Sequence, residues 1–263
     1  MGTRGVWPAR LAFIVVLGLA GRSHAGKAPD VSALRAQLAA PDSGTAGAAA
    51  AALGTIRTPA ALDALLDALA LGLAPDVAAA ALDAVARHGA ERSLPVLVAY
   101  AHHRNPGVRA HAVQALGALT ASPPAGQALL AALGDEEAEV RGTAGRLLAW
   151  RRDARAVPAL LALFASGDEV AGPPLAALAG ADEALKVAEL AGKAPDPLVA
   201  HTLGRMALRK DLGPEATYVG IVRALGAIPG DDSLAELRAV AAAAGVPGAA
   251  RKEAQALVEE RAK

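Results

Sequence analysis

The chain has 263 residues, of which 54% are hydrophobic but only 2% are aromatic, and it contains no cysteine. This apolar content excludes an intrinsically disordered chain, and the lack of cysteine excludes disulfides, thiolate metal sites and cysteine catalysis. The formal net charge is +0, with 26 basic and 26 acidic residues and no basic block, so the composition does not indicate nucleic-acid binding.

Residues 1–25 show the three parts of a secretory signal peptide. The basic residues Arg4 and Arg10 precede the uncharged apolar run Leu11 to Gly21, and Ser23-His24-Ala25 supplies a cleavage pattern of small residues. This run is shorter than the roughly 18 residues that a membrane-spanning helix needs. We therefore expect cleavage after Ala25 and export to the periplasm or the medium, with no transmembrane span remaining. A retained anchor or a first repeat helix is the alternative.

Residues 26–263 are predicted to form one all-α domain. Their apolar residues are mostly Ala and Leu, which favour helices, whereas Val and Ile do not alternate with polar residues as they do in strands. The signal peptide holds three arginines and no acid, which leaves 23 basic residues against 26 acidic ones in this domain. A basic groove for nucleic acid is therefore not expected.

One helix pattern recurs along this domain at a step of about 31 residues. Its three positions are four residues apart, so they share one helix face. The successive copies are Thr45, Ala49, Leu53; Val77, Ala81, Val85; Val108, Ala112, Leu116; Val140, Ala144, Leu148; and Val170, Pro174, Leu178. Helical segments such as "PAALDALLDALAL" lie between the copies, and breaks such as "RNPG" join them. This period predicts an α-solenoid of stacked antiparallel helix pairs.

The repeat becomes irregular towards the C-terminus. Leu225 follows the preceding copy by only about half a step, and Leu257 returns to the full step. We therefore expect an additional helix between Ala181 and Gly213 and a bend of the solenoid around residues 173–213. Pro173-Pro174 should shorten or kink the helix that contains them, because proline cannot donate a backbone hydrogen bond.

Several residues of these copies match a known repeat family. They are Asn105, Val108, Arg109, Ala112, Leu116 and Gly117 in one copy and Val140, Arg141, Ala144 and Leu148 in the next. With them, the units resemble HEAT-like repeats of the short bacterial type, first described in phycobilisome lyases. The resemblance covers nearly all of the chain after the signal peptide. The signature of tetratricopeptide repeats is absent.

Three arginines are the candidate partner-binding residues: Arg109, Arg141 and Arg223. For Arg109 and Arg141, the resemblance to HEAT-like repeats implies a structural role, in a ladder of polar contacts between successive repeats. Glu137 precedes Arg141 by four residues and could pair with it along one helix. The alternative is that these arginines, on the inner helices, contribute to a surface that docks an acidic partner.

No catalytic, cofactor-binding or metal-binding residue is predicted. His88 and His102 lie at opposite ends of a helix of about twelve residues, which spans roughly 18 Å and is far too long for a shared metal ion. Deoxyhypusine hydroxylase, a HEAT-like enzyme, binds its metals through His-Glu pairs, and no histidine here is followed by Glu. Phosphate-binding glycine loops, nucleophile elbows and zinc-protease helices are also absent.

The sequence therefore predicts an exported, non-enzymatic scaffold or adaptor that binds a protein partner on its repeat surface; no oligomeric state is predicted. Two alternatives remain. One is a lyase-like or enzyme-accessory protein with a pocket in the irregular region, which convergent polar groups there would favour. The other is a structural spacer in the cell envelope. A wide apolar patch on the inner helices would favour the scaffold.

Overall fold

The computed structural model describes residues 30–263; the predicted signal peptide and the expected mature start at Gly26 lie outside the described residues. The described part forms fifteen α-helices and three short 3-10 helices and contains no strand, which confirms the all-α prediction. None of these helices is long and apolar enough to cross a membrane. The α-helices are α1 (Val31–Leu38), α2 (Ser43–Leu53), α3 (Pro59–Leu71), α4 (Pro75–His88), α5 (Leu94–Tyr100), α6 (Pro106–Gly117), α7 (Pro123–Ala132), α8 (Ala138–Trp150), α9 (Val157–Ala165), α10 (Gly172–Leu178), α11 (Ala181–Ala188), α12 (Asp196–Ala207), α13 (Glu215–Ala227), α14 (Asp231–Ala242) and α15 (Gly248–Arg261). The 3-10 helices are η1 (Glu91–Ser93), η2 (Ala154–Ala156) and η3 (Glu169–Ala171).

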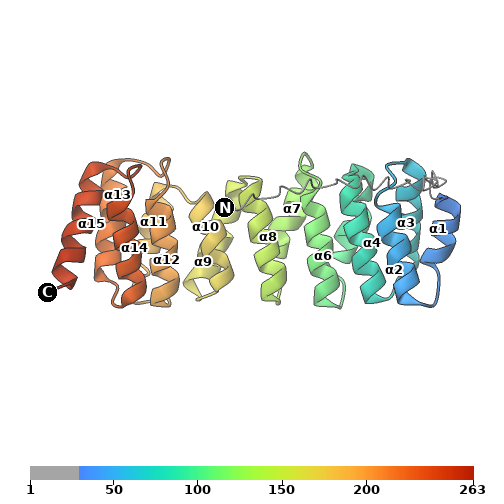
Figure 1. Ribbon diagram of the computed structural model, residues 1–263, viewed down its shortest axis with the longest axis horizontal. Helices are drawn as coiled ribbons and strands as arrows, with labels where there is room; N and C mark the ends of the chain where they lie inside the picture. The colour runs from blue at the N-terminus through green and yellow to red at the C-terminus, as the bar shows by residue number, and fades with distance from the viewer. Residues whose placement is uncertain (1–29) are drawn as a thin grey trace, which may run out of the picture.

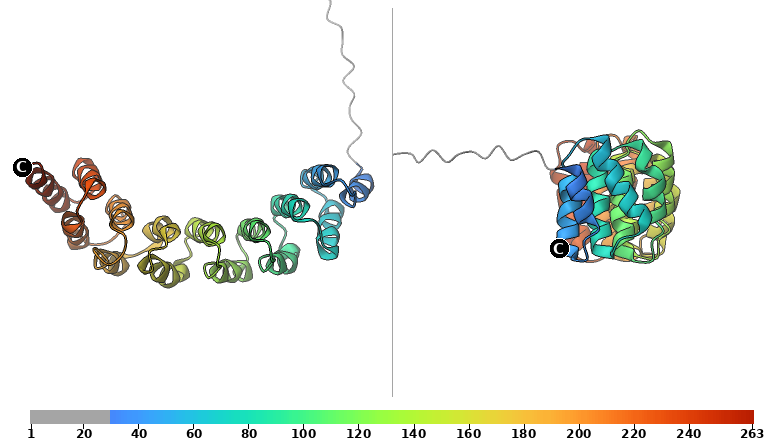
Figure 2. Two further views of the ribbon diagram at one scale, coloured as in Figure 1. Left: turned by 90° about the horizontal axis from the view of Figure 1, so that it is seen from below. Right: turned by 90° about the vertical axis from the view of Figure 1, so that its right-hand side faces the viewer.

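The helices stand side by side in an elongated array with their axes across its length (Figure 1). Each even-numbered helix contacts the next even-numbered one, from α2 to α14, and these helices form one row. The odd-numbered helices form the second row. Seen along the helix axes, the array is an arc, with the even-numbered row on its concave side and the odd-numbered row on its convex side (Figure 2). This arrangement confirms the predicted α-solenoid of stacked helix pairs.

Local sequence signals set where the helices begin and end. Asp42 and Asn105 cap α2 and α6, because their side-chain oxygens accept hydrogen bonds from the backbone N–H groups of Thr45 at 2.7 Å and of Val108 at 3.3 Å. Gly89 ends α4 in the left-handed conformation, with φ of 58°, which glycine adopts without steric cost. These short connections keep consecutive helices antiparallel.

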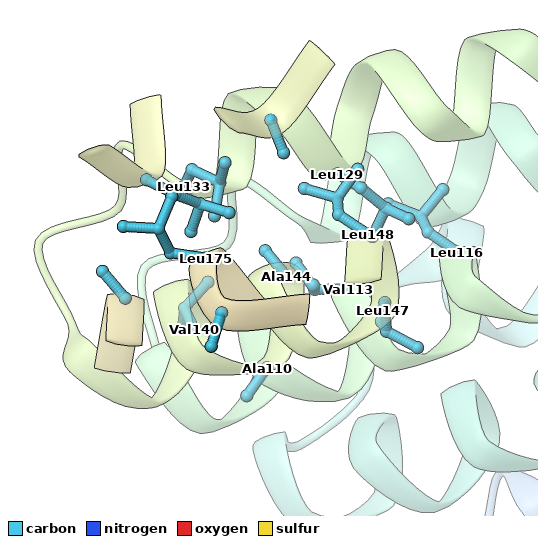
Figure 3. Close-up of a cluster of buried hydrophobic side chains, with 14 of the residues drawn as sticks. Ala110, Val113, Leu116, Leu129, Leu133, Val140, Ala144, Leu147, Leu148 and Leu175 are labelled. Atoms are coloured by element: carbon cyan, nitrogen blue, oxygen red, sulfur yellow. The ribbon is translucent and has the colours of Figure 1, made fainter. Parts of the chain in front are cut away.

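The repeated helix face is the core of the array. Val108, Ala112 and Leu116 of α6 are at most 2% exposed, and Val140, Ala144 and Leu148 of α8 are fully buried. Figure 3 shows Leu116 and Leu148 packed beside Leu129 of the opposite row. The predicted buried face is therefore confirmed in these copies. In the first copy the structure differs, because Thr45 is exposed in the first turn of α2.

Small residues bring neighbouring helices of one row close together. A Cβ atom added to Gly54 would lie 2.8 Å from the Cβ of Ala84 in α4, and one added to Gly226 would lie 2.7 Å from Leu257 in α15. The first contact lies in the even-numbered row and the second in the odd-numbered row. The Ala-Leu-Gly pattern therefore changes rows near the C-terminus, which explains the half step before Leu225.

The structure contains no additional, unpaired helix between Ala181 and Gly213. Instead α11 and α12 continue the alternation of rows, and α12 contacts both α10 and α14. Pro173 and Pro174 lie in the first turn of α10, which has only seven residues, so they shorten this helix as expected. The bend around residues 173–213 stays a prediction.

Candidate interaction surface

A groove of about 760 Å³ crosses the concave face of the array. Its residues come from α4, α6, α8, η3 and the start of α10. Ala110, Thr143 and Pro174 are buried and form its floor, whereas Gln114 and Arg146 are exposed at its sides. The remaining lining residues are Asp83, His111, Ala138, Glu139, Gly142, Ala149, Val170 and Pro173. The groove thus has a floor of short side chains and polar sides.

Two polar pairs join neighbouring helices across this groove. His111 Nδ1 lies 2.8 Å from Asp83 Oδ1, and Arg146 Nη2 donates to Gln114 Oε1 at 2.9 Å. The His111 and Asp83 side chains are 41% and 44% exposed, so water screens this contact. Such exposed pairs contribute only about 0–1 kcal/mol to stability, and their polar atoms can exchange partners at low cost. The groove therefore offers both donors and acceptors to a bound segment.

Arg109 and Arg141 form the ladder that the HEAT-like resemblance implies. Arg109 donates from Nε and Nη2 to the two carboxylate oxygens of Asp135, each at 2.8 Å, and from Nη1 to the carbonyl of His103. Arg141 donates to Asp168 at 2.6 Å and to the carbonyl of Asp135 at 2.8 Å. Each arginine thereby ties the start of its own helix to the loop that precedes the next even-numbered helix.

The ladder differs from the sequence expectation in one contact. Arg141 pairs with Asp168 of the next repeat. Glu137 occupies the N-cap position of α8 and does not pair with Arg141. The Arg109 and Arg141 side chains are only 8% and 18% exposed. Their guanidinium groups therefore have internal structural roles.

The charge state of the ladder follows from these contacts. Burial acts to raise the pKa of Asp135, but hydrogen bonds from Arg109 and the Glu137 amide outweigh it and hold this pKa below its ordinary value. The hydrogen bond to Asp135 in turn raises the pKa of Arg109. Both groups are charged at neutral pH, and the pair is a two-point, charge-assisted contact.

Arg223 lies apart from the other two arginines. It belongs to α13 in the convex row, its side chain is 68% exposed, and its Nε donates to Glu253 of α15 at 2.8 Å. The expectation that all three arginines lie on inner helices is therefore wrong for Arg223, because the repeat pattern changes rows before α13. Partner binding by the three residues stays a prediction.

The histidines are distributed over both edges and the concave face. His88 ends α4 with Nε2 3.2 Å from the carbonyl of Leu53, whereas the ring of His103 stacks on Tyr100 beyond the end of α5. His111 lies in the groove. Within residues 30–263, no three His, Asp or Glu side chains are grouped so as to hold a metal ion.

A second hollow, of about 340 Å³, lies between α10 and α12 in the region where the repeat is irregular. Glu169, His201 and Arg205 contribute its polar side chains. Glu236 of α14 lies against Gly204, and burial raises the pKa of Glu236, an effect that the neighbouring His201 and Arg205 partly offset. The sequence did not single out Glu236, whose only signal is its place in the α14 amphipathic pattern.

Comparison with known proteins supports the repeat architecture. Residues 72–138 match the model for HEAT repeats, and residues 46–70 match the model for the PBS lyase HEAT-like repeat. No curated protein sequence matches the chain. The chain therefore contains HEAT-like repeats, as its sequence predicted.

Similar solved structures include Kap121p, with a TM-score of 0.58 and 13% identity over 85% of this chain and 30% of that chain. The CpcE–CpcF complex of phycocyanin lyase from Nostoc sp. PCC7120 has a TM-score of 0.47 and 19% identity over 90% and 97% of the two chains. Human deoxyhypusine hydroxylase has a TM-score of 0.42 and 20% identity over 87% and 94%. The likeness to Kap121p shows a shared solenoid fold.

Proposed function

We propose that this HEAT-like repeat protein is a non-enzymatic scaffold or adaptor that binds a protein partner in the concave groove across α4, α6, α8 and α10. The groove itself carries the proposal, because a stack of helix pairs provides an extended concave surface without a buried catalytic pocket. Neither a cofactor nor a nucleic acid is part of the proposed role. Export by the N-terminal signal, to the periplasm or the medium, is part of the proposal.

The side chains of the groove fit an extended polypeptide segment. Ala110 and Gly142 leave room for a backbone to lie close to α6 and α8, while Gln114 and Arg146 can bond its peptide groups. Glu139 and Asp83 provide negative charge beside the positive charge of Arg146. This mixture favours a segment of low net charge, bound mainly through its backbone.

The second candidate function is a lyase-like or enzyme-accessory role centred on the hollow between α10 and α12. Its support is the convergence of Glu169, His201 and Arg205 on one concavity in the irregular region. A third role, as a structural spacer in the envelope, requires neither concavity. The three roles therefore differ in which surface must stay intact.

Site-directed cross-linking in cells distinguishes these roles. A photoreactive residue at Gln114, in the groove, should capture a specific protein, whereas the same residue at Gln127, exposed on the convex row, should not. Filling the groove with Gly142→Trp should abolish binding of the captured protein. Equal capture from both positions would refute the groove as the docking surface. Loss of binding in His201→Ala with no effect of Gly142→Trp would favour the second candidate.

A further inference from the structure

The N-terminal end of the array, at the right in Figure 1, carries an apolar hollow of about 430 Å³. It lies where α1 and α3 end and where α2 and α4 begin. Leu38, Ala64 and Val77 are buried in its walls, and Arg35 and Asp67 are the charged residues among its described lining. The hollow shares no lining residue with the concave groove, so the two concavities are separate surfaces.

Leu71, at the end of α3, lies on the rim of this hollow. Its side chain is 89% exposed, more than any other large hydrophobic side chain in residues 30–263. Ala39, Pro41 and Ala74, which also line the hollow, are exposed as well. A single exposed leucine needs no explanation, whereas a contiguous apolar patch around a hollow indicates an interaction surface.

This patch carries both a protruding side chain and a depression that can receive one. With about 430 Å³, the hollow has room for a leucine side chain and part of the turn that carries it. A two-fold axis beside Leu71 places Leu71 of each copy in the hollow of the other, because contacts across such an axis are reciprocal. A head-to-tail contact would leave one leucine and one hollow uncovered. The shape therefore fits a second copy of this chain.

The charges on the rim of the hollow also fit a second copy. Arg35 Nη2 donates to Asp67 Oδ2 at 2.6 Å, and the two side chains are 58% and 55% exposed. An exposed pair of this kind adds little to the stability of the fold, so its members can exchange partners. Across the two-fold axis, Arg35 of one copy meets Asp67 of the other, and this contact occurs twice. The rim is thus complementary in charge to itself.

Two further carboxylates lie near the hollow but do not line it. Asp42 precedes α2 and accepts hydrogen bonds from the backbone N–H and the hydroxyl of Thr45, both at 2.7 Å, so its carboxylate is turned towards its own helix. Asp76 is exposed in the first turn of α4. The other charged residues of α1 to α3 and their connections lie nearer the opposite edge: Asp30, Arg57 and Asp63. Like charges near the hollow therefore weaken the association of two copies without facing the apolar contact.

The segment before α1 does not supply an occupant for the hollow once the leader is removed. After cleavage behind Ala25, the residues that precede Asp30 are Gly26-Lys27-Ala28-Pro29. None of them has a large apolar side chain. A second molecule is therefore needed to cover Leu71 and the hollow.

We propose that two copies of this chain associate about a two-fold axis through their N-terminal hollows. Leu71 of each copy lies in the hollow of the other, and Arg35 of each pairs with Asp67 of the other. One leucine per copy makes a smaller contact than the roughly 1,200–2,000 Å² of stable complexes, so we expect a dissociation constant between about 10 µM and 1 mM. The dimer leaves both concave grooves free, and two linked grooves bind a partner with two matching segments more tightly than one groove does.

Sedimentation velocity of the chain from Gly26 to Lys263, at concentrations from about 10 µM to 1 mM, tests the proposal. A monomer–dimer equilibrium without larger species is expected. Leu71→Ala should weaken dimerisation at least about tenfold, because both leucines of the dimer are lost together. Ser43→Trp, which fills the hollow from its own wall, should do the same. Trp150→Ala removes another exposed apolar side chain, 66% exposed on α8, and is the matched control that should dimerise like the parent.

A charge exchange tests whether the occupant is a second copy. Arg35→Glu and Asp67→Lys chains should each dimerise more weakly than the parent, because each homodimer brings like charges together. A mixture of the two, carrying different fluorescent labels, should associate about tenfold more tightly than either variant alone, since both contacts between copies are again opposite in charge. The groove variant Gly142→Trp should dimerise like the parent, so failure of the concave site would not affect this result.

Three results would overturn the proposal: a parent chain that stays monomeric at about 1 mM, unchanged dimerisation of Leu71→Ala, or a mixture that associates no more tightly than its components. Leu71-dependent binding of a monomer to phosphatidylglycerol vesicles would also overturn it, because the patch would then face a membrane surface.

Discussion

Removing the Arg109 side chain should destabilise the array strongly, because this arginine is buried and its hydrogen bonds join two successive repeats. Arg109→Ala deletes both hydrogen bonds to Asp135 and the bond to the His103 carbonyl. The two side chains are only 8% and 12% exposed, and breaking a buried ion pair from one side costs about 3–5 kcal/mol. In this variant Asp135 still accepts the hydrogen bond from the Glu137 amide at 2.9 Å. We therefore expect the free energy of unfolding to fall by an amount near the lower end of this range, about 3 kcal/mol.

Urea unfolding followed by circular dichroism measures this loss, with Arg223→Ala as the matched control. Arg223 also pairs with one carboxylate, but its side chain is 68% exposed, so its removal should cost at most about 1 kcal/mol. The double variant Arg109→Ala/Asp135→Ala should be less destabilised than the sum of the two single variants, because no unpaired carboxylate remains. If Arg109→Ala unfolds at the same urea concentration as Arg223→Ala, the buried ladder does not stabilise the array.

The same pair predicts a pH dependence with a definite sign. The pKa of Asp135 is lowered in the folded protein, so its contribution to stability is present above the unfolded-state pKa of about 3.9. That contribution is lost as the pH falls through the lower folded-state pKa. The stability difference between the parent and Arg109→Ala should therefore shrink below about pH 4. A difference that stays constant down to acid unfolding would contradict the assigned charge state.

Three further predictions follow from the packing and from the N-terminal sequence. Leu116→Asp should lower the free energy of unfolding by several kcal/mol, because it places a charge at a fully buried position; unfolding like the parent would refute the assigned core face. Gly54→Ala should destabilise by about 1–3 kcal/mol in thermal unfolding, because its Cβ would lie 2.9 Å from the Ala84 backbone, whereas Gly47→Ala in open space should stabilise by up to about 1 kcal/mol. N-terminal sequencing of the exported protein should begin at Gly26, and an intact leader would disprove cleavage there.

Much of the fold could be read from local patterns. Val108, Ala112 and Leu116 recur with a spacing of four in several copies, and a regular helix places such residues on one face wherever it packs. Their burial was therefore predictable before the neighbours were known. The structural role of Arg109 was predictable from the same recurrence, through the resemblance to HEAT-like repeats.

The partners of these residues were not predictable in the same way. Arg109 bonds Asp135 and Arg141 bonds Asp168, each across an intervening helix, and these pairs form only when the interhelical loops reach the helix starts. Arg141 instead had a plausible local partner in Glu137, four residues away. Sequence spacing favours the local pair, whereas the direction of the packed side chain selects the distant one.

The concave groove depends on a further level of structure. Helical periodicity indicates which face of each helix is buried, but it does not indicate in which of the two rows the helix lies. Arg223 was misplaced for this reason, since the pattern moves to the convex row at α13 without changing its local form. Asp83 and Pro174 lie 91 residues apart and line one groove only because α4, α6, α8 and α10 pack in order. Helices, caps and core positions follow from short-range sterics and burial, whereas rows, edges and concave surfaces arise from the relative placement of whole helices.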